Sequence, residues 1–88
     1  MSVQYLCLKR GVLQHHIEPD EDWLEFPSRY LKANPHAAVY RKRHTGGQYL
    51  RYAYDKAKRH PRQMRSTVME RHELPPEVQA AMLLLDIK

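Results

Sequence analysis

The pattern of hydrophobic and polar residues predicts a β-hairpin at the start of the chain. Residues 3–8 read Val-Gln-Tyr-Leu-Cys-Leu and are rich in strand-forming side chains. Gly11 interrupts this run, and residues 12–17 can return as a second strand. We therefore expect a hairpin over residues 3–17, with its turn at the basic residues that precede Gly11.

The next segment is expected to form only short helical turns, across residues 20–34. Asp20 or Asp22 can cap a first turn, because an aspartate oxygen accepts a hydrogen bond from the free backbone N–H groups there. Pro27 is expected to end this helix after about one or two turns, since proline breaks helices in their interior. Pro35 sets a second limit.

Residues 37–55 allow two interpretations. In the first they form a hairpin, because Gly46 and Gly47 supply the positive φ angles that tight turns need. In the second a helix runs over residues 45–60, with aromatic side chains at helical spacing. We favour the hairpin, because strand-forming aromatic residues follow the glycine pair at once.

In the hairpin over residues 37–55, the alternation of side chains divides the tyrosines between two faces. Tyr52 and Tyr54 would face one way and are expected in the core. Tyr49 would lie on the other side together with Arg51, which makes it the better candidate for stacking on a nucleic-acid base. Tyr40 is a second stacking candidate.

The last third of the chain is expected to form two helices, over residues 61–87. Pro61 suits a first helical turn, and Met64 and Val68 have helical spacing. Pro76 would begin a final helix that is apolar around most of its circumference. Such a helix can close the core and also pair with its copy in a symmetric homodimer. The residues expected at this protein interface are Val78, Met82 and Leu85.

These elements together predict an α+β fold in one domain, residues 1–88. The expected architecture is a small antiparallel sheet of up to four strands, made of the two hairpins and covered by the two C-terminal helices. Because the domain is short, its core must be thin.

Composition indicates a protein of a reducing compartment. Cys7 is the single cysteine, so no disulfide can form within the chain. The longest apolar run, residues 80–85, is far shorter than a membrane span, and no signal peptide is evident. We expect a cytoplasmic protein that does not engage a membrane.

Positive charge is concentrated in the middle of the chain. Residues 36–65 carry nine Lys and Arg against one acid, a net charge of +8. Residues 1–35 carry four basic and five acidic residues, or −1, and residues 66–88 carry two basic and four acidic, or −2. A basic field interleaved with tyrosines suits a phosphate backbone and its bases.

The leading hypothesis is therefore a small, non-enzymatic regulatory or accessory protein that binds DNA or RNA through this central segment. Counterion release on neutralising phosphates would make the binding strongly salt-dependent. The residues expected to contact nucleic acid are Arg41, Lys42, Arg43, His44, Tyr49, Arg51, Lys58, Arg59, Arg62 and Arg65. The alternative is a protein-binding inhibitor or adaptor whose basic face docks on an acidic patch of a larger enzyme or polymerase.

No metal or cofactor is expected. His15 and His16 are adjacent, so on a strand they point to opposite faces and cannot share one ion. His60 and His72 have no cysteine pair to complete a tetrahedral site. Cys7 lies in an alternating apolar run and is expected in the core.

The stretch over residues 39–43 and 47–52, Val-Tyr-Arg-Lys-Arg and Gly-Gln-Tyr-Leu-Arg-Tyr, loosely resembles the central hairpin of RelE-type endoribonuclease toxins. The resemblance implies a lesser alternative, a metal-independent endoribonuclease that uses Arg, Lys, His and Tyr on a sheet. Members of that family begin with two substantial helices, which Pro19, Pro27 and Pro35 would interrupt here. No catalytic residue is therefore assigned from the resemblance.

Overall fold

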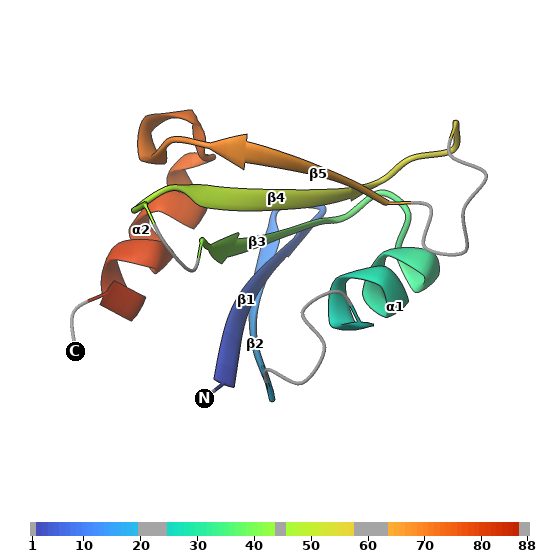
Figure 1. Cartoon of the computed structure of the whole chain (residues 1–88), viewed down its shortest axis with the longest axis horizontal. Coiled ribbons are helices and arrows are strands. Elements are labelled where there is room, and N and C mark those ends of the chain that lie inside the picture. Colours follow the sequence, from blue (N-terminus) through green and yellow to red (C-terminus); the bar gives the residue numbers. More distant parts are fainter. Residues whose placement is uncertain (1, 20–24, 44–45, 58–63, 87–88) are drawn as a thin grey trace.

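A computed structural model describes residues 2–19, 25–43, 46–57 and 64–86. Within these residues, five strands form one antiparallel sheet in the order β2-β1-β3-β4-β5, accompanied by two α-helices (Figure 1). The α+β class is confirmed. The elements, in chain order, are β1 (Ser2–Lys9), β2 (Val12–Pro19), α1 (Glu25–Ala33), β3 (Ala38–Lys42), β4 (Tyr49–Tyr54), β5 (Met64–Met69), the 3-10 helix η1 (Arg71–Glu73) and α2 (Pro76–Asp86).

Both predicted hairpins are confirmed. In the first, β1 pairs with β2 so that Tyr5 lies opposite His16, and a two-residue turn joins the strands. In the second, β3 pairs with β4 and Val39 lies opposite Tyr52. The helix considered for residues 45–60 is therefore wrong over the part of that range that the structure describes.

The helix predicted to begin at Pro61 is wrong where the chain is described, because Met64–Met69 form strand β5. β5 pairs antiparallel with β4, so that Tyr52 lies opposite Ser66. The separation of four that placed Met64 and Val68 on one helix face also places them on one face of a strand. Among the described residues, α2 is the one α-helix that follows β5, and it begins at Pro76 as expected.

The prediction that Pro27 ends a helix is also wrong. Pro27 is the third residue of α1, within the first turn, where its missing N–H would have had no helical partner. The helix ends near Asn34, whose backbone N–H and side-chain Nδ2 both donate to the carbonyl of Tyr30, at 2.9 and 3.0 Å. The expected capping residues Asp20 and Asp22 lie outside the described residues.

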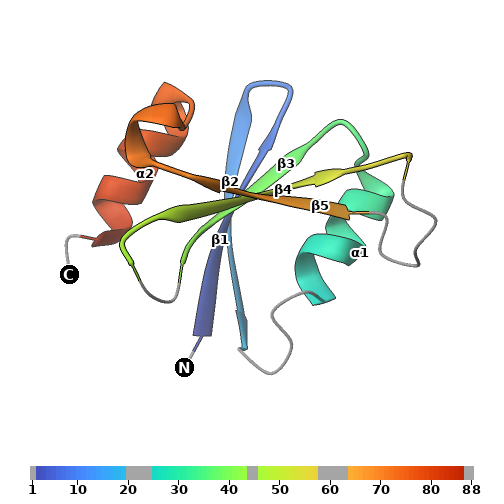
Figure 2. The ribbon, with the colours of Figure 1, turned by 45° about the horizontal axis from the view of Figure 1, so that its top comes forward.

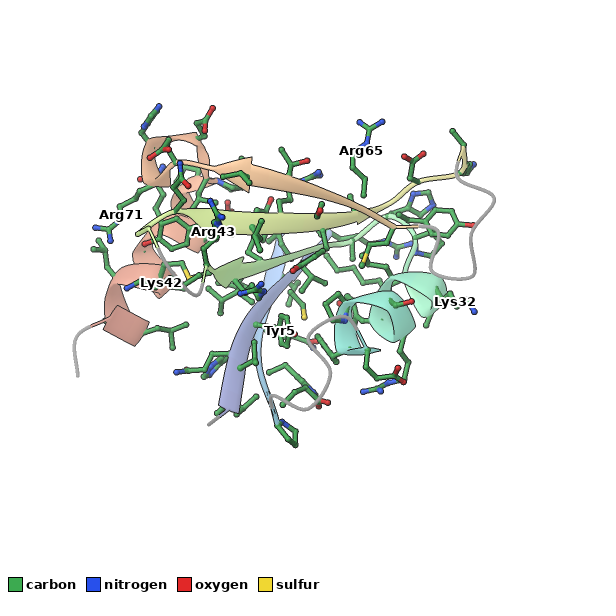
Figure 3. The ribbon with its side chains drawn as sticks, in the orientation of Figure 1. Tyr5, Lys32, Lys42, Arg43, Arg65 and Arg71 are labelled. Atoms are coloured by element: carbon green, nitrogen blue, oxygen red, sulfur yellow. The ribbon has the colours of Figure 1, made fainter. Side chains whose placement is uncertain are left out.

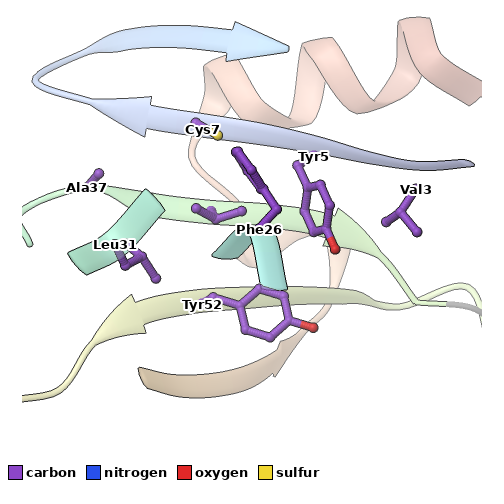
Figure 4. Close-up of a cluster of buried hydrophobic side chains, with 8 residues drawn as sticks. Val3, Tyr5, Cys7, Phe26, Leu31, Ala37 and Tyr52 are labelled. Atoms are coloured by element: carbon purple, nitrogen blue, oxygen red, sulfur yellow. The ribbon is translucent and has the colours of Figure 1, made fainter. Parts of the chain in front are cut away.

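One face of the sheet packs against α1. Tyr5, Val39 and Tyr52 point to this face from three neighbouring strands, and Phe26 and Leu31 meet them from the helix (Figure 4). The Phe26 ring lies 5.0 Å from that of Tyr5. Burial of these large side chains stabilises this layer by about 2 kcal/mol for each fully buried residue.

The other face packs against α2, and the two helices lie on either side of the twisted sheet (Figure 2). Leu6, Tyr40 and Tyr49 alternate in sequence with the residues of the α1 face, and they contact Val78 and Met82 of the helix. The sheet is thus the middle layer between two hydrophobic clusters. No described helix has the length and apolar character needed to cross a membrane.

Candidate nucleic-acid interface

The basic side chains of the β3–β4 hairpin do not share one face. Arg41 lies opposite Leu50 on the α1 face, whereas Lys42 lies opposite Tyr49 on the α2 face. Arg51 lies opposite Tyr40 and so also belongs to the α2 face. Because successive residues of a strand point to opposite sides, the run Arg41-Lys42-Arg43 cannot form a single cationic surface. The three predicted contacts Arg41, Lys42 and Arg43 therefore do not lie on one surface.

Arg41 is a buried residue, and the prediction that it contacts phosphate is not supported. Only 9% of it is exposed. Its Nε donates to the Tyr52 hydroxyl at 3.1 Å, and its Nη1 donates to the carbonyl of Lys42 at 2.9 Å. A buried guanidinium needs such partners, because removing the charge from water is costly. Arg41 therefore has a structural role between β3 and β4.

Tyr49 is not available to stack on a base, so that prediction is wrong. Its side chain is fully buried in the cluster beneath α2. Arg71 covers it from outside, with the guanidinium 5.9 Å from the ring centre and Nη2 donating to the Tyr49 hydroxyl at 3.0 Å. Tyr40, the second stacking candidate, is only 3% exposed.

The sheet end that carries the β3–β4 turn is nearly neutral. Lys42, Arg43 and Arg71 lie together there, close to α2 (Figure 3). Arg43 donates to the Gln48 side chain at 2.7 Å, and Gln48 in turn donates to the Glu70 carboxylate at 2.7 Å. Residues 42–43, 46–50 and 69–73 contain three basic and two acidic residues, a net charge of +1. This is a weak field for a polyanion.

Four of the predicted contact residues lie outside the described residues: His44, Lys58, Arg59 and Arg62. Arg65, at the start of β5, is exposed and points away from the sheet (Figure 3). Its Nε lies 3.4 Å from Asp55 Oδ2, so it forms an ion pair. Arg51 is half-buried on the α2 face.

The opposite end of the sheet brings separate basic segments together. A continuous row crosses the sheet there, in which Leu8 lies opposite Ala38, Ala38 opposite Ala53, and Ala53 opposite Arg65. Neighbouring strands are about 4.8 Å apart, so the start of this row on β1 lies about 10 Å from β4. The β1–β2 turn, the end of β4 and the start of β5 therefore share one end.

The last turn of α1 joins the same end, because Lys9 Nζ donates to Asn34 Oδ1 at 2.7 Å. Residues 8–14, 30–38, 52–57 and 64–66 contain five Lys and Arg and one acid, a net charge of +4. We call this surface the basic end. Its described cations are Lys9, Arg10, Lys32, Lys56 and Arg65, and Asp55 is the one carboxylate in these described ranges.

Four cations of the basic end carry uncompensated charge within the described structure. Among the described residues, Arg65 alone of the five pairs with a carboxylate, and Lys9, Arg10, Lys32 and Lys56 form no ion pair with any other described residue. All four are exposed. Exposed cations that are not paired with a carboxylate can attract an external anion.

Arg10 has an unusual backbone conformation. It has φ of 51° and the following Gly11 has φ of 76°, so both residues of the turn are left-handed. Such two-residue hairpin turns favour Asn-Gly, because a larger side chain is strained there by about 1 kcal/mol. An arginine is thus held at the tip of the hairpin at a conformational cost.

A groove between β2 and α1 adjoins the basic end. Its nearer part is a cavity of about 430 Å³ lined by Lys9, Arg10, Val12, Gln14, Tyr30 and Asn34. A second cavity of about 490 Å³ shares Gln14 and Tyr30 with it and extends toward His16 and Phe26, whose rings stack at 4.0 Å. The open groove is therefore basic at one end and aromatic along its helix side.

Two ionisable groups in the groove, the Cys7 thiol and the Tyr30 hydroxyl, have raised pKa values. Burial raises the pKa of the Cys7 thiol to about 11, so this cysteine is protonated and is a poor nucleophile. Burial also raises the pKa of Tyr30, and a negative charge on Cys7 would raise it further. Neither group would repel an anion. Among the described residues, no three His, Cys, Asp or Glu side chains are grouped to hold a metal ion.

The expected protein interface on α2 is not exposed where it was predicted. Val78 is fully buried and Met82 is 2% exposed, so both pack within the molecule, and Leu85 is half-buried. The exposed large apolar residues among the described positions of the helix are instead Leu83 and Leu84, at 44% and 72%. The homodimer remains a prediction.

Comparison of the chain with protein families, with curated proteins and with solved structures finds no match. The assignment of the basic end as a candidate site therefore rests on the geometry of this structure alone. Sequence reasoning missed Lys9 and Arg10 because they lie far along the chain from the central basic run. The signal that could have found them is the predicted hairpin, since its turn falls on these two residues.

Proposed function

We propose that the protein binds nucleic acid through the basic end, as a small regulatory or accessory protein. The observation that carries this proposal is the convergence of Lys9 and Arg10 with Lys32 and Lys56 from three separate segments at one end of the sheet. A net charge of +4, with four exposed cations that form no ion pair with other described residues, suits successive phosphates of one backbone.

The rival partner is an acidic protein surface, which the same charge would attract. Binding to nucleic acid and binding to a protein can be distinguished by their salt dependence and by whether bare oligonucleotides bind. Phosphate contacts release condensed counterions, so the logarithm of the binding constant falls linearly with the logarithm of salt concentration. A folded partner protein would instead require matched contacts, and bare oligonucleotides would remain unbound.

The test is a titration of fluorescently labelled DNA and RNA oligonucleotides, with anisotropy measured from about 50 to about 200 mM salt. We expect log-linear weakening with a slope that reports several phosphate contacts. The variant Arg10→Asn, Lys32→Gln, Lys56→Gln should reduce the duplex slope by about 2–3, because each lost contact removes about 0.9. Circular dichroism would verify that this variant is folded.

The matched control removes three cations elsewhere: Arg29→Gln, Lys42→Gln, Arg43→Gln. It lowers the net charge equally but leaves the basic end intact, so its slope should stay near that of the unmodified protein. Equal losses in the two triple variants would mean that binding follows net charge alone. Absence of binding to every oligonucleotide at low salt would refute the proposed function.

A further inference from the structure

The groove beside the basic end has the chemistry of a site for an unpaired base. Its nearer cavity, about 430 Å³, combines two cations at the rim with the half-buried ring of Tyr30 and the side-chain amide of Gln14. Cavities of this size hold small ligands. Aromatic rings next to cations are how proteins hold single strands, by stacking on bases and pairing with phosphates.

The polar groups of the cavity differ in their availability. Asn34 is engaged, since its Oδ1 accepts from Lys9 and its Nδ2 donates to the carbonyl of Tyr30. Gln14 is exposed on edge strand β2, and it forms no side-chain hydrogen bond with the described part of the chain. Its amide can both donate and accept, as the edge of an unpaired base requires.

We propose that this cavity binds one unpaired nucleotide of a single strand, with its phosphate at Lys9 and Arg10 and its base against Tyr30 and the Gln14 amide. The inference rests on the proposed function and adds a preference for single-stranded over duplex nucleic acid. Bases of a duplex are stacked and paired, so they cannot enter the cavity without unpairing. The continuation of the groove toward His16 and Phe26 gives the neighbouring nucleotide a second aromatic surface.

The experiment compares a labelled single strand of about 12 nucleotides with its duplex at about 50 mM salt, where electrostatic binding is strong. The single strand should bind more tightly. Gln14→Leu and Tyr30→Leu should weaken single-strand binding, Tyr30→Leu by about tenfold, and leave duplex binding unchanged. Arg10→Asn should weaken both.

Gln4→Leu is the matched control, because Gln4 lies on the opposite face of the same hairpin. It makes the same chemical change as Gln14→Leu and should leave binding unaltered. Gln14→Leu, at an exposed position, keeps the test valid should Tyr30→Leu fold poorly.

The outcomes separate the two proposals. Equal affinity for single strand and duplex, with no effect of Gln14→Leu, would overturn the cavity assignment while the basic end kept its role. If the unmodified protein bound no oligonucleotide at all, both the cavity assignment and the proposed function would be overturned. A glutamate-rich peptide could also be tested as a competitor of the labelled single strand. If it competed as well as the unlabelled single strand, the groove would recognise acidic chains in general, which would contradict the nucleotide assignment.

Discussion

Arg10 shows how one residue can be placed against its own conformational preference. Its φ of 51° lies in the region that favours glycine and asparagine. Its side chain is exposed and forms no ion pair or hydrogen bond with the described residues, so no such contact among them offsets the strain. Backbone strain that no described contact offsets, at a residue of the candidate site, suggests that the side chain is used in binding.

Arg10→Asn should therefore stabilise the fold. Asparagine adopts the left-handed conformation more readily and completes the Asn-Gly pair that two-residue hairpin turns favour. The expected gain in the free energy of unfolding is about 0.5–1 kcal/mol, measured by urea denaturation. Arg10→Ala serves as the control, since it removes the same charge without the favourable turn residue. A stability loss in the asparagine variant would contradict the proposed strain.

Individual side chains at the candidate site were the least predictable part of the protein. The alternation that separated Tyr49 from Tyr52 was correct, yet both are buried because each face of the sheet is covered by a helix. The burial of Arg41 depends on the Tyr52 hydroxyl of the neighbouring strand, a contact that no local pattern contains. Which cations remain exposed is decided by tertiary packing.

At the scale of elements, α2 is apolar almost all round but packs on one side. Val78 and Met82 are buried against the sheet, while Leu84 is 72% exposed on the same helix. The helix therefore stabilises the fold through a single stripe.

Met82→Ala should lower the free energy of unfolding by about 2–5 kcal/mol, because it leaves a cavity between α2 and the sheet. Leu84→Ala, on the exposed side of the same helix, should change it by less than about 0.5 kcal/mol in a monomer. Chemical denaturation of the two variants measures both values. A cost for Leu84→Ala that grows with protein concentration would reveal the dimer contact predicted from sequence.

The first hairpin could be predicted because strand-forming residues lie on both sides of Gly11. The second was favoured over a helix by the glycine pair, and α2 was predicted from Pro76 at its first turn. The sequence predicts a helix in place of β5 because Met64 and Val68 are four residues apart, a spacing that fits one face of a helix and one face of a strand. Its pairing with β4, which decides the matter, is a non-local contact.

At the scale of the whole molecule, cations that are clustered along the chain do not form one cluster on the folded surface. Residues 36–65 carry most of the positive charge, but alternation splits the cations of β3 and β4 between two faces and Arg41 is buried. The order β2-β1-β3-β4-β5 instead brings the β1–β2 turn to the same end of the sheet as the end of β4 and the start of β5. The class of partner could be proposed from composition, whereas its location needed the strand order.

Mapping of backbone amide chemical shifts during titration with a single-stranded oligonucleotide tests the position of the interface most directly. We predict that the largest shifts fall on residues 9–14, 30–34 and 56–57, around the basic end and its groove. Residues 42–43 and 46–48, at the β3–β4 turn, should remain near their free positions. Shifts centred on the β3–β4 turn, or no shifts at all, would contradict the account.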